Sequence, residues 1–164
     1  MVGKSIRKVS SAAVEKGNVI RAFRGEFGFL SNFSDDPVRM DDGILYPTAE
    51  HAFQAQKVVD VEKRRCMVEK CGTAKSAKAW GKRAKPLRAD WNDIRVDVMR
   101  EVIGAKFKGG SEELREMLVA TGERELVEGN VWNDTFWGVS LRTGKGQNQL
   151  GKILMEVREE LKKK

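Results

Sequence analysis

The sequence predicts a single α+β domain that is mostly helical and carries a small β-sheet. Its 164 residues are enough to bury a core without disulfides or metals. A hydrophobic content of 40% and a charged content of 34% are ordinary for a globular protein. Helical apolar periodicity dominates the second half, whereas short runs bounded by Gly and Asp indicate strands and turns. We find no internal repeat, so we expect one domain over residues 18–164 and a loosely held leader over residues 1–17.

The first elements are expected to be short strands and turns. Val19, Ile20 and Phe23 favour a short strand. Residues 27–34 (FGFLSNFS) alternate aromatic with small or polar residues, which indicates a strand end and a turn. The Asp41-Asp42-Gly43 turn, followed by a short apolar run, predicts a hairpin over residues 37–46.

Helices are expected from residue 49 onward. Thr48 is a good N-cap for a helix from Ala49 to about Val59, because Pro47 discourages helix at the residue before it. Capping residues, apolar periodicity and helix breakers mark the later elements. We expect helices over Val61–Lys70, Ala74–Ala84 and Trp91–Phe107, a helix capped by Ser111, strands over Glu125–Gly129 and Val139–Leu141, and a last helix starting at Asn148 or Gln149.

Composition excludes several functional classes. No run approaches the roughly 18 apolar residues of a membrane span, and no apolar signal segment follows the basic N-terminus, so we expect an intracellular, cytoplasmic protein. The cysteines Cys66 and Cys71 lack the further Cys or His of a zinc site, and His51 is the only histidine. We therefore expect no metal or cofactor. The net charge of +7, with no acid between Glu69 and Asp90, favours phosphorylated or polyanionic ligands.

The stretch from Gly28 to Lys57 is the strongest candidate for a site. It starts as a loop rich in Asn, Ser and Asp and continues into the helix predicted after Thr48. On that helix, Glu50, Gln54 and Lys57 would share one side, because seven residues advance nearly two turns. A plain ion pair on the helix surface is the alternative interpretation.

Several segments together resemble the NADAR (YbiA-like) family. They are GFLSNFS, YPTAEHAFQAQK, Trp91 with Arg95, AKF at 105–107, NDTFWG and GQNQLG, and they extend from about Arg24 to the end of the chain. Members of this family are N-glycosidases. Some hydrolyse phosphoribosylated intermediates of riboflavin synthesis, and others remove ADP-ribose from guanine in nucleic acid. The resemblance implies a YbiA-like fold and a hydrolase, without deciding between these substrates.

Cleavage of a ribosyl N-glycosidic bond needs a carboxylate near the developing positive charge, a donor to the departing base, and a nucleophile at C1. Glu50 and Asp134 are the candidate carboxylates; the alternatives are a helix-start charge and a turn residue. Lys57 is the preferred nucleophile, either at C1 or as an imine with opened ribose, provided that its pKa is lowered. Lys106 is a phosphate contact or an alternative nucleophile, and direct attack by water stays open.

The remaining candidate residues would bind substrate through stacking, hydrogen bonds or phosphate contacts. They are Phe29, Asn32, Phe33, His51, Gln54, Trp91, Arg95, Lys106, Trp137, Gly138 and Asn148. Simpler roles compete: tryptophans are more often core residues, the 144–151 loop could be a plain helix cap, and His51 could bind a backbone group.

We expect a monomer that removes ADP-ribose from guanine in DNA or RNA, because a basic protein meets nucleic acid favourably. Hydrolysis of phosphoribosylated riboflavin intermediates and a non-catalytic module that binds ADP-ribose or nucleic acid are the alternatives.

Overall fold

The computed structural model describes residues 17–164, so the leader predicted for residues 1–17 lies, except for Gly17, outside the described residues. The helices after the first hairpin agree closely with the predicted segments. They are α2 (Ala49–Ala55), α3 (Val61–Lys70), α4 (Ala74–Arg83), α5 (Trp91–Lys108), α6 (Glu112–Val119) and α7 (Gln149–Lys162). Over the described part of the chain, no helix is both long and apolar enough to cross a bilayer.

The strands form three separate pairs instead of the single small sheet that the sequence predicts. β1 (Val19–Ile20) pairs in parallel with β4 (Glu125–Leu126), and β5 (Gly129–Asn130) pairs in parallel with β6 (Val139–Ser140). β2 (Val38–Arg39) and β3 (Leu45–Tyr46) form the predicted antiparallel hairpin. Each strand is two residues long, and the three pairs share no strand.

The strand end and turn predicted for residues 27–34 are only partly correct. A 3₁₀ helix, η1 (Gly25–Leu30), occupies the first half of this stretch and buries Phe29 and Leu30. Short aromatic runs fit either a strand or a single helical turn, and packing against the rest of the core decides between them.

Helix α2 ends four residues earlier than the sequence predicts. Its last turn tightens, because the N–H groups of Gln56, Lys57 and Val58 each donate to the carbonyl three residues before. Lys57 therefore lies beyond the helix, and its position relative to Glu50 is not set by regular helical spacing.

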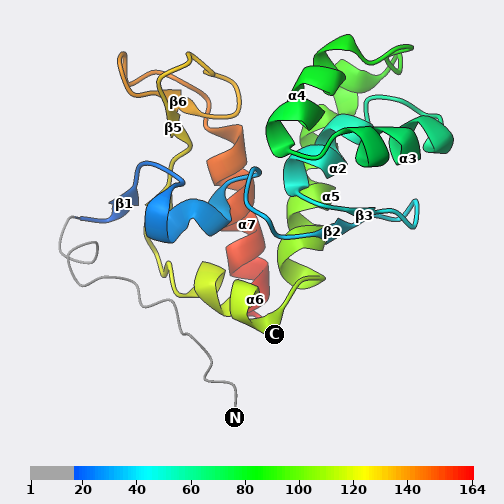
Figure 1. The fold of residues 1–164 in the computed structure, drawn as a ribbon. Helices are drawn as coiled ribbons and strands as arrows, with labels where there is room; N and C mark the ends of the chain where they lie inside the picture. Colours follow the sequence, from blue (N-terminus) through cyan, green and yellow to red (C-terminus); the bar gives the residue numbers. More distant parts are fainter. Residues whose placement is uncertain (1–16) are drawn as a thin grey trace.

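Helices α5 and α7 run beside one another through the middle of the molecule (Figure 1). Helix α2 packs against both α4 and α5, whereas β4 and α6 contact α7. Side chains from all these parts meet in one apolar core. Leu30, Val102, Phe107, Leu126 and Leu154 are completely buried in it.

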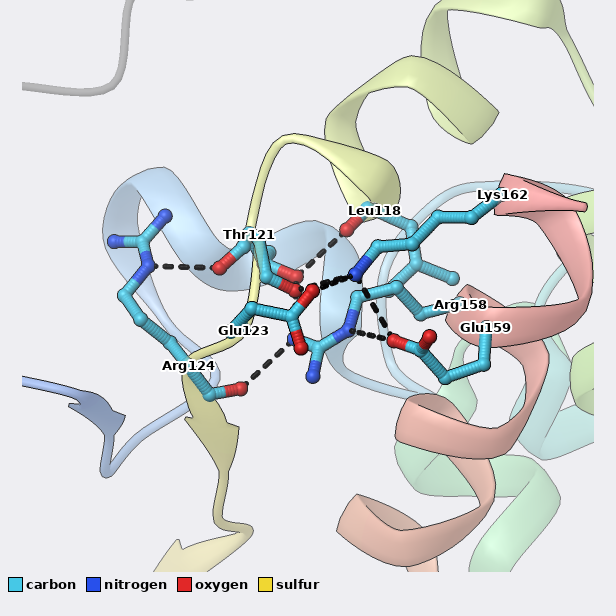
Figure 2. A network of polar contacts seen from close by, with 8 residues as sticks. Leu118, Thr121, Glu123, Arg124, Arg158, Glu159 and Lys162 are labelled. Atoms are coloured by element: carbon cyan, nitrogen blue, oxygen red, sulfur yellow. Dashed lines mark hydrogen bonds and ion pairs between the residues drawn. The ribbon is translucent and has the colours of Figure 1, made fainter.

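A buried arginine fixes α7 to the turn that follows α6. Arg158 Nη1 donates to Thr121 Oγ1 at 2.9 Å and to the Arg124 carbonyl at 2.8 Å (Figure 2). Near the end of the helix, Lys162 pairs with Glu123 and Glu159. These bonds fix the position of α7 along its own axis. They therefore also fix where the loop before α7 lies.

Candidate active site

A cavity of about 430 Å³ lies between the α2–α4–α5 group of helices and the segment that carries β5 and β6. A volume of this size is typical of a small-molecule site. Many residues that the sequence singles out line this cavity. They are Asn32, Phe33, Glu50, Gln54, Lys57, Trp91, Arg95, Asp134 and Trp137.

Glu50 is held at the cavity by its own backbone and by a neighbouring amide. Its N–H donates to the Asn32 carbonyl at 3.0 Å, which joins the start of α2 to the loop after η1. Gln54 Nε2 donates to Glu50 Oε1 at 2.8 Å. Burial raises the pKa of Glu50, while the bond from Gln54 and the charge of Lys78 oppose that change. Glu50 is therefore a buried carboxyl in fixed geometry and not a solvated charge at a helix start.

Lys57 reaches the same cavity from the turn after α2. Its Nζ donates to the Gly81 carbonyl at 3.3 Å and lies 5.9 Å from the centre of the Trp91 ring. Burial lowers the pKa of Lys57; the carboxylate of Glu50 raises it, and the cation of Lys78 lowers it further. A lysine in these surroundings has a larger fraction of free amine than an exposed one.

Asp134 is both a turn residue and part of the cavity wall. Its Oδ1 accepts the N–H groups of Phe136 and Trp137 at 3.1 and 2.9 Å. Asn130 braces the same loop, because its side chain bonds both the N–H and the carbonyl of Asp134. Oδ1 makes these turn contacts, which leaves Oδ2 without a hydrogen-bond partner among residues 17–164 and able to act on a ligand.

Aromatic rings form the apolar part of the wall. Phe53 lies between two tryptophans, with ring centroids 5.1 Å from Trp91 and 5.3 Å from Trp137. Arg95 stacks its guanidinium 3.7 Å from the centre of the Phe136 ring. Stacking fixes the plane of the guanidinium, and residues 17–164 provide no hydrogen-bond acceptor for its N–H groups, so these groups can bind a phosphate.

Three buried oxygens on the cavity lack a hydrogen-bond partner among the described residues. They are Asn32 Oδ1, Gln54 Oε1 and Glu128 Oε2. A buried polar atom without a partner costs roughly 1–3 kcal/mol, and such atoms in folded proteins are often found at functional sites. All three oxygens belong to residues that line the same cavity, which supports a role for this region in binding a polar ligand.

The structure places two of the predicted ligand contacts in a supporting role away from the cavity. The ammonium of Lys106 is fully buried and donates to the carbonyls of Phe29 and Ser31, at 2.6 and 2.9 Å, and to Ser34 Oγ at 2.8 Å. Burial lowers the pKa of Lys106 to about 8. Its three N–H groups are all engaged, so Lys106 braces the loop that carries Asn32, and Phe29 belongs to the core.

His51, Gly138 and Asn148 also lie off the cavity wall. The His51 ring bonds Thr48 Oγ1 at 2.8 Å and the Cys71 carbonyl at 2.7 Å, which agrees with the simpler role considered for it. Asn148 bonds the backbone of the segment between β4 and β5. Gly138 is buried against the same segment.

Sequence reasoning missed Glu128, Lys78, Asn130 and Trp132 as cavity residues. In the sequence, Glu128 stands out only as an acidic residue that follows the apolar pair Leu126-Val127. It falls inside the strand predicted over Glu125–Gly129 and was therefore given no role at a site. Lys78 was considered only as one of the basic residues in the acid-free stretch between Glu69 and Asp90. Within residues 17–164, no group of three or more His, Cys, Asp or Glu residues is arranged to hold a metal ion.

Comparisons with known proteins identify a family to which this chain is similar. A family model described as the NADAR domain matches residues 21–162. The N-glycosidase YbiA of Escherichia coli (strain K12) is 43% identical over 137 residues, which cover 83% of this chain and 82% of that protein. A riboflavin biosynthesis protein of Vibrio vulnificus (strain YJ016) is 40% identical over 134 residues, covering 82% of this chain and 35% of that protein. The NMR structure of the E. coli protein YbiA superposes with a TM-score of 0.74 at 40% identity, over 87% of this chain and 83% of that one.

Proposed function

The chain belongs to the NADAR domain family, and from that premise we propose that it is an N-glycosidase that hydrolyses the bond between ribose C1 and a base nitrogen. One observation carries this activity more than any other. Glu50 and Lys57, from α2 and the turn after it, line a single cavity with aromatic walls together with Asp134, which is far from them in the sequence. The sugar and base of a nucleoside match such walls, because both have flat or apolar faces and polar edges.

Each group has a role that its surroundings support. The carboxylates of Glu50 and Asp134 stabilise the positive charge that develops at C1 and the ring oxygen. The amine of Lys57 attacks C1, and water then releases the sugar; alternatively, a water molecule held by the carboxylates attacks directly. The lowered pKa of Lys57 favours the lysine route, because only the free amine is a nucleophile.

For the substrate we favour ADP-ribose linked to guanine in DNA or RNA. Arg24, Lys78 and Arg95 bring positive charge to the cavity, and the exposed rings of Phe33 and Trp132 lie on its wall. Cations of this kind bind phosphates, and exposed rings stack on bases. Phosphoribosylated intermediates of riboflavin synthesis are the second candidate, which the name of the Vibrio relative favours.

Both substrate classes should be tested in parallel. The protein is incubated with ADP-ribosylated DNA and, separately, with phosphoribosylated riboflavin intermediates, and release of the base is followed by chromatography. Glu50→Gln and Asp134→Asn should abolish release and leave binding intact, whereas Glu112→Gln, an exposed carboxyl in the first turn of α6, should behave as the wild type. Unchanged release by Glu50→Gln and Asp134→Asn would place the catalytic groups elsewhere.

The lysine route has its own test. Borohydride reduction in the presence of substrate should join ribose to Lys57, which peptide mass spectrometry would locate. Lys57→Met should give no adduct, and the exposed Lys75→Met should give as much as the wild type. Turnover without any adduct in the wild type would leave direct attack by water as the mechanism.

A further inference from the structure

Glu128 is a carboxyl on the cavity wall that none of the roles above uses. It lies between β4 and β5, and its Oε2 is buried without a hydrogen-bond partner among the described residues. Asp134 and Glu50 are near enough to act on its charge. The pKa of Glu128 is raised to about 7, mainly by burial and then by the charge of Asp134; Lys78 opposes this rise and Glu50 adds to it. Near neutral pH, Glu128 can therefore hold a proton while still able to release it.

The backbone on both sides of Glu128 is clamped. Its N–H donates to Asn148 Oδ1 at 3.0 Å, and its carbonyl accepts the N–H of Val139 at 2.8 Å. The same Asn148 side chain donates through Nδ2 to the Leu126 carbonyl at 2.9 Å. Asn148 adopts a left-handed backbone conformation (φ 52°) as it leads into α7. One amide thus fixes the segment that presents Glu128 relative to the central helix.

Because Gly138 has no side chain, it leaves room for the backbone and side chain of Glu128. A Cβ atom at position 138 would lie 2.2 Å from the Glu128 carbonyl oxygen and 3.0 Å from Glu128 Cγ. Both distances are shorter than van der Waals contact, so any side chain at 138 would displace Glu128. Gly138 and Asn148, which the sequence suggested among the ligand contacts, therefore both act on the backbone that presents this carboxyl.

Resting on the N-glycosidase activity proposed above, we infer that Glu128 donates the proton that the departing base requires, with Asn148 and Gly138 as positioning residues. When the bond from C1 to the base nitrogen breaks, its electron pair goes to the base. The base takes the proton of Glu128, which becomes a carboxylate. Water supplies hydroxide to C1 and its remaining proton to a carboxylate of the cavity, and exchange with solvent restores Glu128.

The other charged groups on the cavity are Arg24, Glu50, Lys57, Lys78, Arg95 and Asp134. A general acid works only while protonated, so the turnover rate of the wild type should fall as the pH rises through about 7. In Glu128→Gln this decline should disappear, because glutamine does not titrate. The decline should remain in the exposed control Glu112→Gln, which leaves Glu128 unchanged.

The decisive test uses Glu128→Gln with a series of N-ribosides whose bases depart with increasing ease. For the poorest leaving group, turnover should fall by roughly 100-fold or more, the usual size of a general-acid contribution. The loss should shrink towards none as the base becomes stable without a proton. An equal loss along the whole series would overturn the inference, as would wild-type rates. Should the wild type cleave no N-riboside at all, the proposed function itself is wrong and the inference falls with it.

The positioning role has a matched pair of variants. Within residues 17–164, Asn133 and Asn148 are the non-glycine residues with positive φ. Asn148→Gly keeps the backbone conformation and removes both side-chain bonds, so it should lower kcat with little change in KM and should make the leaving-group dependence steeper. Asn133→Gly makes the same backbone change on an exposed side chain and should match the wild type. Asn148→Gly with a wild-type dependence would show that Glu128 needs no such clamp.

Discussion

Two glycines inside helices have opposite surroundings, which allows a controlled test of how Glu50 is held. A Cβ atom at Gly81 in α4 would lie 1.8 Å from Gln54 Oε1 and 3.1 Å from Gln54 Cβ. A Cβ atom at Gly104 in α5 would meet nothing within 4 Å. Alanine in place of a helix-interior glycine normally stabilises a protein by about 1 kcal/mol. We therefore compare Gly81→Ala with Gly104→Ala.

Gly104→Ala should raise Tm by roughly 2–4 °C, the shift that 1 kcal/mol produces in a chain of this size. Gly81→Ala should lower it. The new methyl group forces the Gln54 amide to move by more than 1 Å in a buried site, and overpacking of this kind costs about 1–3 kcal/mol. The displaced amide also loses its bond to Glu50, and a hydrogen bond to a charged group contributes about 1.5–3 kcal/mol. Together these two terms exceed the gain in helix propensity by about 1.5–5 kcal/mol, so Tm should fall by roughly 3–20 °C.

Gly81→Ala and Gly104→Ala should also differ in their rates of turnover. Misplacement of a catalytic group by about 1 Å can lower turnover by roughly 100-fold, and Glu50 in Gly81→Ala has lost the amide that orients it. Gly104→Ala should keep the rate of the wild type. The measurements are thermal unfolding by circular dichroism and base release with the preferred substrate. If Gly81→Ala proved as stable and as active as Gly104→Ala, Gln54 would not be what holds Glu50.

Three further predictions follow from other contacts. Lys106→Met leaves the buried carbonyl of Phe29 without its donor and takes one of two donors from the Ser31 carbonyl, which keeps the N–H of Ser34; it should lower the free energy of unfolding by about 2–4 kcal/mol. The exposed Lys108→Met should change it by about 1 kcal/mol or less in denaturant titrations. The raised pKa of Glu128 means that the folded state binds its proton more tightly, so this carboxyl costs stability as the pH rises from 4.5 to about 7. Glu128→Gln should therefore be more stable than the wild type by about 3 kcal/mol at pH 8 and equal to it at pH 4, and a constant difference across this range would contradict the assignment. Arg95→Lys keeps the positive charge and loses the stacking of the guanidinium on the Phe136 ring. The KM for a phosphorylated substrate should therefore rise about tenfold, with kcat nearly unchanged. An unchanged KM would show that Arg95 does not bind the phosphate.

Some elements were readable from the sequence because local chemistry specifies them. The cap at Thr48 accepts the N–H of His51 as expected, and the Asp41-Asp42-Gly43 turn joins the predicted strands. The same reasoning failed at residues 25–30, where a short aromatic run fits either of two local structures. It also extended α2 past Ala55, because nothing local shows that the last turn tightens.

The candidate site, like the fold, could be predicted from the sequence only in part. Residue types and motifs were sufficient to select Glu50, Lys57, Asp134 and Trp91, which do line one cavity. They could not distinguish Lys57 from Lys106, because a lysine that contacts a ligand and one that braces a loop look alike in a sequence. Three carbonyl and hydroxyl acceptors brought together from residues 29–34 decide that Lys106 is a brace.

The sequence alone determined the helical segments, the absence of several metal-ligand patterns and the chemical class of the candidate groups, since these depend on composition and on neighbours within a few residues. Tertiary structure decided which charges share a cavity and which proton each can hold. Glu128 illustrates the difference. Its neighbours in the chain are ordinary strand residues, whereas its elevated pKa comes from burial and from the charges of Asp134 and Glu50, which other segments bring to it. Burial and long-range electrostatic contacts exist only once the chain has folded.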